Sequence, residues 1–220
     1  MDLTSSMMVA CQQSILVRKS GRLKMLSGLV LLSGGMDSST LLYYVIETLK
    51  YDKVEAIVFD YGQRHRIEIS YAQTIAERLG ISYEIVKVDI AQFGGSSLIS
   101  EDRNLSVVVP GRNAIFLSLA AAYAKTRELE DVFFGPTLED YSGFPDCRDS
   151  FVRLMNRALA IGIGIRGIHA PFIHLGKKEV VALGKELGVP YDLTWSCYFP
   201  TDNNKPCGRC HACMERELVL

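Results

Sequence analysis

The stretch LVLLSGGMDSSTLL, residues 29–42, decides the fold of this chain. Its first residues, Leu29–Leu32, form a short apolar run that is typical of a buried parallel strand, and a helix is predicted over Asp37–Leu49. Between them, Gly34 and Gly35 allow a tight turn at the helix start, where free N–H groups and the positive end of the helix dipole favour an anion. The stretch therefore predicts a loop that binds phosphate or pyrophosphate.

Asp37 narrows the kind of phosphate site, because a carboxylate repels a phosphate. Its side chain must either cap the helix or hold a Mg²⁺ ion that bridges the phosphates. No lysine follows the two glycines, so the loop is not the usual Walker A motif. The glycines are also not spaced as they are in the dinucleotide-binding fingerprint.

Downstream of this loop, apolar runs and amphipathic stretches alternate, which predicts strands that alternate with helices. The further strands are expected over Val54–Phe59, Tyr83–Val88, Val132–Phe134 and Ile168–Ile173. The further helices are expected over Arg66–Leu79, Asn113–Leu129, Asp149–Ala160 and Lys177–Leu187. The predicted fold class is α/β, with an open parallel sheet and helices on both faces. In such folds ligands bind at the carboxyl ends of the strands, so the loops that follow the strands should form one surface.

The chain divides into three parts. Residues 25–190 are expected to form the α/β domain, and residues 1–24 a leader of uncertain order or the product of a translation start upstream of Met25. The leader has one acidic residue, Asp2, and several basic ones, so a transit peptide is the alternative interpretation. Residues 191–220 contain most of the cysteines and are expected to form a small C-terminal metal-binding element, in which the metal would hold the tail beside the active-site face.

The charge balance and hydropathy exclude two kinds of partner. Lysine and arginine total 24 against 25 aspartates and glutamates, a net charge of −1. Without a basic excess, the chain has no global means of holding a nucleic-acid backbone. The longest purely apolar run is too short to cross a bilayer. We therefore expect neither a nucleic-acid nor a membrane partner.

Four of the six cysteines fall close together, at Cys197, Cys207, Cys210 and Cys213. Two Cys-x-x-Cys steps present thiolates to one ion, and zinc favours four such ligands in a tetrahedron. The spacing predicts one structural Zn²⁺ ion per chain, since a site with four protein ligands is closed to substrate. A redox Cys-x-x-Cys pair is the alternative, as is His211 in place of one cysteine.

The loop Ser33–Ser38 resembles the pyrophosphatase loop of the N-type ATP pyrophosphatases, which cleave ATP between its α and β phosphates. Three more segments are expected on the same surface: DYGQRH at residues 60–65, VPGRN at residues 109–113 and DYSGFPDCR at residues 140–148. Together with the cysteine cluster, they resemble the 7-cyano-7-deazaguanine synthase family over nearly all of residues 26–215.

The resemblance implies an adenine nucleotide alpha hydrolase-like fold and an ATP-dependent carbon–nitrogen ligase. It implies that 7-carboxy-7-deazaguanine is adenylated on its carboxylate and that ammonia displaces AMP to give the amide. A second ATP then activates the amide, and loss of AMP leaves 7-cyano-7-deazaguanine (preQ0), a precursor of queuosine or archaeosine. The small-molecule partners would be ATP, ammonia and the deazaguanine acid, and the resemblance also implies a cytoplasmic homodimer.

Site residues follow from the motifs. Nucleotide contacts are predicted along the first loop and its helix, and at the end of the second strand. These residues are Leu32, Ser33, Gly34, Gly35, Met36, Asp37, Ser38, Ser39, Thr40, Leu41, Leu42, Arg64 and His65. The predicted catalytic residues are Ser33, Asp37 and Arg112.

The substrate is predicted to contact Arg112, Asn113, Asp146 and Arg148. A guanidinium at Arg112 can pair with a phosphate or a carboxylate, and the carboxylate of Asp146 suits the N–H groups of a guanine-like ring. The alternatives are a solvated turn at Arg64 and His65, a helix cap at Asn113, and an internal ion pair between Asp146 and Arg148. Cys147 is interpreted as a packed thiol, because ATP already activates the carboxylate and no thiol nucleophile is needed.

Two rival functions stay open on the sequence. One is a tRNA-thiolating member of the same superfamily, which would need a catalytic cysteine pair and a basic docking surface. The other is a nucleotide-binding zinc module without catalysis.

Overall fold

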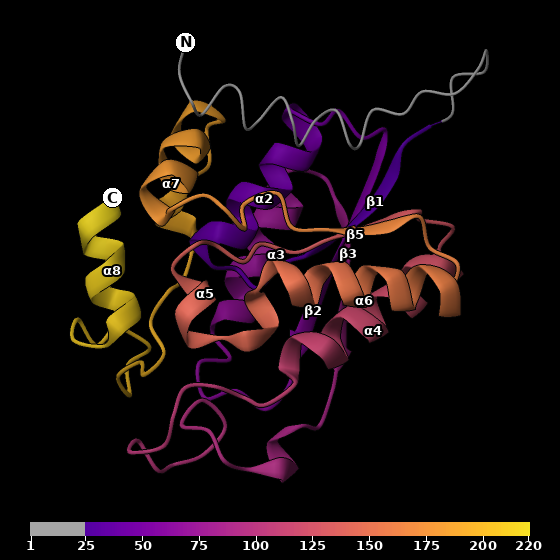
Figure 1. Cartoon of the computed structure of the whole chain (residues 1–220). Helices are drawn as coiled ribbons and strands as arrows, with labels where there is room; N and C mark the ends of the chain where they lie inside the picture. The colour runs from indigo at the N-terminus through magenta and orange to yellow at the C-terminus, as the bar shows by residue number, and fades with distance from the viewer. Residues whose placement is uncertain (1–24) are drawn as a thin grey trace.

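The computed structural model describes residues 25–220, so the leader predicted over residues 1–24 lies outside the described residues. Five parallel strands form one open sheet in the order β3-β2-β1-β4-β5, which confirms the predicted architecture (Figure 1). The strands are β1 (Ser27–Leu31), β2 (Lys53–Asp60), β3 (Ser82–Lys87), β4 (Asp131–Phe133) and β5 (Gly167–His169).

β1 lies at the centre of the sheet, where the direction of strand order reverses. Its residue Leu29 pairs with Glu55 of β2 on one side and with Val132 of β4 on the other. The loops that leave neighbouring strands in opposite directions open a crevice at the carboxyl end of such a strand. The loop after β1 therefore lies where ligands bind in this class of fold.

Helices cover both faces of the sheet, and each face has its own hydrophobic core. In β1, Val30 belongs to one core and Leu29 to the other, as the alternation of side chains along a strand requires. The first core packs beneath α2 (Met36–Glu47), α3 (Glu68–Arg78) and α7 (Lys177–Glu186). The second packs beneath α4 (Arg112–Thr126) and α6 (Asp149–Gly162).

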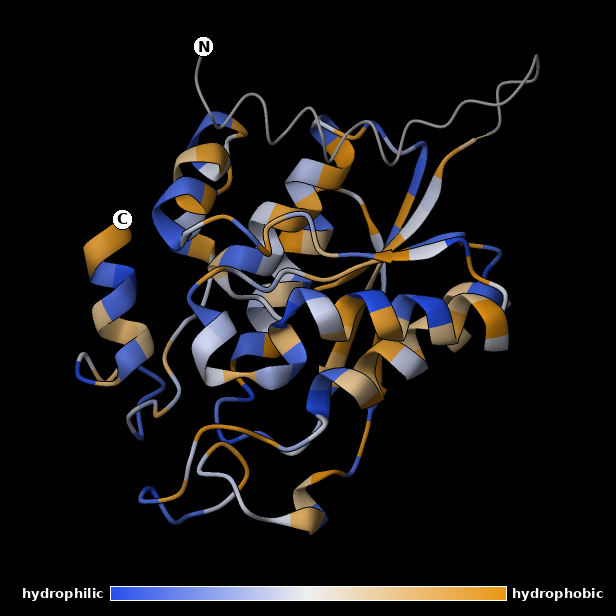
Figure 2. Ribbon diagram, viewed as in Figure 1, coloured by the Kyte–Doolittle hydropathy of each residue, from blue (hydrophilic) through white to orange (hydrophobic). Residues whose placement is uncertain are grey.

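The hydropathy of the chain follows this layering. The central strands β1, β2 and β4 are mostly hydrophobic, whereas the helices alternate between hydrophobic and hydrophilic residues around their axes (Figure 2). Within residues 25–220, no helix combines the length and the apolar character that crossing a membrane would require.

β5 is shorter than the sequence predicts, because it ends at His169 rather than Ile173. Pro171 follows two residues later and has no N–H group to extend the ladder. The chain turns there, with the N–H of Ile173 donating to the carbonyl of Ala170.

Two α-helices and three 3₁₀ turns escaped prediction. The α-helices are α5 (Asp140–Gly143) and α8 (His211–Val219), and the 3₁₀ turns are η1 (Ala91–Phe93), η2 (Pro145–Cys147) and η3 (Tyr191–Leu193). α8 begins directly after Cys210, so its first turn contains Cys213 and overlaps the cysteine motif. The spacing of the cysteines concealed the helical period there.

Candidate active site and metal centre

The loop between β1 and α2 rests directly on the first turn of α3. Gly34 has a φ of +82°, and a Cβ placed on it would lie 2.3 Å from the carbonyl oxygen of Glu68 and 2.8 Å from the nitrogen of Ala72. Only glycine combines this backbone conformation with so close an approach. Gly34 is therefore required by packing as well as by the turn.

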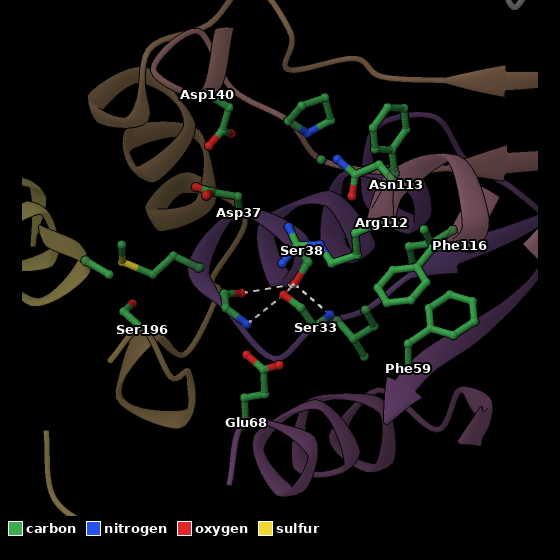
Figure 3. Close-up of a pocket in the computed structure, with 18 of the residues that line it drawn as sticks. Ser33, Asp37, Ser38, Phe59, Glu68, Arg112, Asn113, Phe116, Asp140 and Ser196 are labelled. Carbon is green, nitrogen blue, oxygen red and sulfur yellow. Dashed lines mark hydrogen bonds between the residues drawn. The ribbon is translucent and has the colours of Figure 1, made fainter. Parts of the chain in front are cut away.

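Serine hydroxyls hold the loop in shape. The hydroxyls of Ser33 and Ser38 lie 2.9 Å apart, and the hydroxyl of Ser38 also accepts from the N–H of Ser33 at 3.1 Å (Figure 3). The N–H of Gly35 donates to the Ser33 hydroxyl at 3.3 Å. The first turn of α2 leaves N–H groups without helical partners at the same place. This arrangement of hydroxyl and amide donors suits the oxygens of a phosphate group.

A pocket of about 270 Å³ opens beside the loop, at the carboxyl ends of β1 and β2. Several residues predicted to bind nucleotide or substrate line it together: Leu32, Ser33, Gly35, Met36, Asp37, Ser38, His65, Arg112 and Asn113. Gly34 supports the loop from behind, as described above.

The other predicted site residues lie outside this pocket. Ser39, Thr40, Leu41 and Leu42 are buried in the body of α2, where the Thr40 hydroxyl contacts the Tyr191 hydroxyl at 2.7 Å. Arg64 points to a neighbouring loop, where Nη1 donates to the carbonyl of Ser100 and pairs with Glu101 at 2.9 Å. The structure therefore does not bring these side chains to the loop between β1 and α2 (residues 32–35), which we call the phosphate loop.

Asp37 lies near two charged side chains, Lys177 and Glu215, that are far from it in the sequence. The Nζ of Lys177 lies 3.6 Å from Asp37 Oδ2 and also pairs with Glu215 of α8. Burial raises the pKa of Asp37 to about 7, Lys177 opposes this effect, and the carboxylates of Asp140 and Glu215 add to it. Figure 3 shows the carboxylates of Asp37 and Asp140 on the same side of the pocket.

The surroundings of Asp37 fit a bound divalent cation. Its Oδ1 is buried and has no hydrogen-bond partner among the described residues. An unpaired buried carboxylate oxygen is costly, and a hard cation such as Mg²⁺ would supply its missing partner. The donor set is thus suited to the ion that accompanies a nucleotide triphosphate.

Arg112 enters the pocket from the start of α4. Its Nη1 donates to the Tyr61 hydroxyl at 3.4 Å, and its guanidinium carbon lies 5.8 Å from the centre of the Tyr61 ring. In Figure 3 the Arg112 side chain points from α4 toward Ser33 and Ser38. An anion held between the loop and Arg112 would be neutralised from two sides.

Asn113 and Asp146 form a helix cap. Asp146 Oδ2 accepts from the backbone N–H of Asn113 at 3.0 Å, in the first turn of α4. Arg148 Nε donates to the carbonyl of Tyr141 at 3.2 Å, and its guanidinium carbon lies 5.5 Å from the centre of the Tyr141 ring. Asp146 and Arg148 thus bind other protein groups and do not line the pocket, whereas Asn113 does.

Two aromatic rings form a flat apolar wall of the pocket. Phe59 from β2 and Phe116 from α4 stack with their centroids 4.2 Å apart and their planes 11° from parallel (Figure 3). Flat aromatic surfaces pack well against a planar heterocycle. Phe116 follows Arg112 by one helical turn, and this spacing is the one signal in the sequence that could have placed it at the pocket.

Cys147 also lines the pocket, where Asn113 Nδ2 lies 3.3 Å from its sulfur. Burial raises the pKa of the thiol to about 12, and the carboxylate of Asp140 adds to the effect. The thiol is therefore protonated at neutral pH, which makes it a poor nucleophile.

The four C-terminal cysteines converge. The sulfurs of Cys197, Cys207, Cys210 and Cys213 all lie within 4.8 Å of one another. The backbone N–H of Cys207 donates to the sulfur of Cys197 at 3.2 Å, and that of Cys210 to the sulfur of Cys207 at 3.4 Å. Four converging sulfurs are the donor set that a tetrahedral zinc ion prefers, so the cluster suggests zinc. His211 is not part of the cluster.

The cysteine-rich element contacts the phosphate loop. The N–H of Trp195 donates to the carbonyl of Gly34 at 2.8 Å, and its indole N–H donates to the carbonyl of Cys197 at 2.8 Å. The same element lines the pocket with Trp195, Ser196, Tyr198, Ala212 and Glu215. Sequence reasoning missed two charged residues of the pocket, Lys177 and Glu215, and neither lies in a motif that marks it.

Comparison with known proteins agrees with this geometry. The family model described as "Queuosine biosynthesis protein QueC" matches residues 27–220. The 7-cyano-7-deazaguanine synthase of Thermoplasma acidophilum is 44% identical over 204 residues, which cover 85% of this chain and 84% of the relative. That of Leptospira interrogans is 42% identical over 205 residues, which cover 86% and 84%.

Solved structures show the same fold at low sequence identity. The NMN synthetase of Francisella tularensis matches with a TM-score of 0.55 at 18% identity. The match covers 99% of this chain and 80% of the synthetase chain. The U34-tRNA thiolase NcsA of Methanococcus maripaludis has a TM-score of 0.59 at 16% identity and covers 90% and 67%. Given a family match over the whole described α/β fold and its cysteine cluster, this chain belongs to the QueC family of 7-cyano-7-deazaguanine synthases.

Proposed function

We propose that this chain converts 7-carboxy-7-deazaguanine and ammonia into 7-cyano-7-deazaguanine at the expense of ATP, for the synthesis of queuosine or archaeosine. The carboxylate is adenylated first, and ammonia displaces AMP to give the amide. A second ATP adenylates the amide oxygen, and loss of AMP leaves the nitrile. The observation that carries the proposal is the phosphate loop between β1 and α2, which shares one pocket with Arg112 and with the unpaired oxygen of Asp37.

The chain's own residues divide the work of adenylation. Hydroxyls of Ser33 and Ser38 and the amides at the start of α2 bind the departing pyrophosphate. Arg112 binds the substrate carboxylate or the α-phosphate, and Asn113 lies beside it. Asp37 would hold a Mg²⁺ ion, which would neutralise the phosphates of ATP.

The planar wall of Phe59 and Phe116 supports a heterocycle in the same pocket. Two planar rings must bind in this reaction, the adenine of ATP and the deazaguanine. Stacking gives affinity without fixing hydrogen-bonded specificity. The substrate contacts predicted for Asp146 and Arg148 would require both side chains to leave their present protein partners.

We assign the four cysteines to one structural Zn²⁺ ion in an element formed by residues 191–220, appended to an ATP-binding domain formed by residues 25–190. The convergence of the four sulfurs supports the assignment. By pinning residues 195–198 beside the phosphate loop, the ion would complete one wall of the pocket.

We also propose that the chain forms a homodimer, as its family resemblance implies, and that it acts in the cytoplasm. Two large apolar side chains of α6, Leu154 and Ile161, are 70% and 78% exposed and lie two turns apart. A second copy of the chain could cover them. Light scattering on the eluted protein would give the mass of the assembly, and a monomer at assay concentration would remove this part of the proposal.

The function is tested by mass spectrometry of the products. The purified chain, ATP, Mg²⁺, ammonium and the deazaguanine acid should give the amide and then the nitrile, with AMP and pyrophosphate. AMP formation that depends on tRNA would favour a thiolase instead, and nucleotide binding without turnover would favour a binding module.

A further inference from the structure

Glu68 is a carboxylate of the pocket that no motif-based assignment includes. It occupies the first turn of α3, and its backbone carbonyl packs against Gly34 of the phosphate loop. Its side chain lines the pocket and is 15% exposed. Figure 3 shows the carboxylate pointing toward the loop from the side opposite Asp37 and Asp140.

The Glu68 carboxylate is held from behind by buried polar groups. Gln63 Nε2 donates to Glu68 Oε1 at 3.0 Å, and His65 Nε2 lies 3.3 Å from Glu68 Oε2. Gln63 is 1% exposed and His65 4% exposed. Gln63 is itself fixed to the end of β2, because its amide also bonds the carbonyl of Phe59 and the N–H of Tyr61. The carboxylate is therefore fixed in position while one side stays open to the pocket.

The charge of Glu68 interacts with that of Arg112 in the same pocket, but the two side chains do not form an ion pair. In the described part of the chain, no lysine or arginine nitrogen lies within 4.0 Å of it, and its one ion-pair partner is His65. A mostly buried carboxylate without a lysine or arginine in direct contact is costly, so the pocket favours a small cation beside Glu68. Arg112, by contrast, offers a positive charge to the same pocket.

This arrangement matches the two small reactants of the proposed function, on which the inference rests. One is a carboxylate, which Arg112 attracts, and the other is ammonium, the form in which ammonia is mostly present at neutral pH. We propose that Glu68 binds ammonium in the pocket and accepts a proton from it, with Gln63 and His65 as positioning residues.

The proton transfer balances as follows. Ammonium gives one proton to Glu68, which frees the nitrogen lone pair, and the nitrogen attacks the carbonyl carbon of the acyl adenylate. The carbon–nitrogen bond forms, and the carbon–oxygen bond to AMP breaks, with its electron pair leaving on AMP. The second proton lost from nitrogen passes to water, and so does the proton on Glu68 before the next turnover.

The test separates adenylation from the attack of nitrogen. Glu68→Gln keeps the shape and the hydrogen bond from Gln63 but removes the charge. Glu77→Gln, which makes the same change at an exposed position of α3, is the matched control. Three readouts are compared with the unmodified chain: acid-dependent exchange of pyrophosphate into ATP, KM for ammonium, and hydroxamate formation with hydroxylamine. Hydroxylamine is largely uncharged at neutral pH and does not need a carboxylate to bind or to deprotonate it.

Glu68→Gln should leave pyrophosphate exchange and hydroxamate formation close to those of the Glu77→Gln control. Its KM for ammonium should rise at least about tenfold, the loss expected for one charge-assisted hydrogen bond. Glu68→Asp keeps the negative charge but places it farther from the pocket. Its KM for ammonium should therefore lie between the values of Glu77→Gln and Glu68→Gln. If Glu68→Gln folds poorly, the KM of Glu68→Asp for ammonium is compared with that of the control instead.

Two results would overturn the assignment. One is an ammonium KM for Glu68→Gln equal to that of the control. The other is a loss of exchange and hydroxamate formation as large as the loss with ammonium, which would give Glu68 a role in folding or ATP binding. Absence of acid-dependent exchange in the unmodified chain would instead overturn the proposed function, and the role of Glu68 with it.

Discussion

At the scale of single residues, Asp37 illustrates a conflict between stability and function. Its carboxylate is partly buried, one oxygen has no partner, and burial raises its pKa to about 7. A group whose pKa is raised on folding destabilises the fold as it ionises. This destabilisation falls at the position that we propose holds Mg²⁺.

Replacing Asp37 by Asn should separate the two effects. Without Mg²⁺ or nucleotide, the variant should be more stable than the unmodified chain, by a margin that grows as pH rises from about 4 to about 7. The sign follows because the raised pKa of Asp37 removes stability over that interval, and Asn does not ionise. Thermal unfolding in buffer without added Mg²⁺ or nucleotide measures this margin. ATP turnover should fall at least about a hundredfold, if the cation neutralises the phosphates. Equal stability at pH 8 would contradict the first expectation.

Gly34 carries a second prediction at this scale. In Gly34→Ala the new Cβ would meet backbone atoms of α3, and the φ of +82° is unfavourable for alanine. We expect a loss of at least about 2 kcal/mol in the free energy of unfolding. Gly35→Ala is the control, because its φ of −78° suits alanine and its nearest contact, 3.3 Å away, is a serine side chain. Chemical denaturation of both variants would measure the difference, and equal losses would contradict the argument.

The residues of the phosphate loop could be predicted because they are adjacent in sequence and their chemistry is local. Lys177, Glu68 and Glu215 could not, because each reaches the pocket from a separate helix and none lies in a distinctive pattern. Asp146 shows the opposite difficulty. Its type suits a guanine-like ring, but the first N–H groups of α4 need a cap and take its carboxylate.

At the scale of elements, the cysteine-rich segment and α8 act as a wall of the pocket rather than as a separate module. Trp195 bonds to Gly34, and Arg216 of α8 donates to the hydroxyls of Thr194 and Ser196. The four-cysteine cluster and the phosphate loop are therefore joined through a few hydrogen bonds. Removing the ion should affect both.

Cys207→Ser tests this coupling. We expect loss of bound zinc, a red shift in the fluorescence of Trp195 as it becomes exposed, and loss of ATP turnover. Trp195 is the only tryptophan in the chain, so the emission reports on this segment alone. His211→Ala is the matched control, since His211 lies between two ligands but outside the cluster, and it should keep zinc and turnover. Zinc-free protein with full turnover would contradict the coupling.

The long elements were predictable because their hydrophobic periods are clear, and the errors lie at their ends. Pro171 stops β5 early, and α8 was hidden because the cysteine spacing of its first turn dominated the pattern. Short helices such as α5 depend on tertiary contacts and carry little local signal.

At the scale of the whole molecule, a buried charge cluster lies at the start of β4. Asp131 is fully buried and accepts from the Tyr51 hydroxyl at 2.6 Å and from Arg166 Nε at 2.9 Å, and His169 Nε2 lies 2.9 Å from it. It thus connects β4 with β5 and with the segment that precedes β2. Burial alone would raise the pKa of Asp131, but its bonds with His169, Arg166 and Tyr51 outweigh it and lower the pKa to about 2.

This cluster should set the acid stability of the fold. Because the pKa of Asp131 falls from 3.8 to about 2 on folding, its ionised form stabilises the protein above about pH 4. That contribution, about 2 kcal/mol, should be lost as pH falls from about 4 to about 2. Asp131→Asn should therefore be less stable than the unmodified chain at pH 7, with a difference that narrows toward pH 2. Urea denaturation across this range would measure it, and a constant difference would contradict the assignment.

The overall architecture followed from the sequence, because alternating strands and helices admit few arrangements and place the loops at one edge. The sequence also predicted that the C-terminal tail would lie beside the active-site face, but not the contacts through which residues 195–215 close the pocket. These contacts join segments far apart in the chain, such as Trp195 with Gly34, and no local pattern encodes them.

The protonated thiol of Cys147 has a chemical consequence for the end of the reaction. A nitrile is an electrophile, and a thiolate beside it would add to the carbon and leave the enzyme blocked by its own product. Because burial keeps the Cys147 sulfur neutral, a nitrile formed in this pocket would not meet a thiolate at Cys147 and would be free to depart.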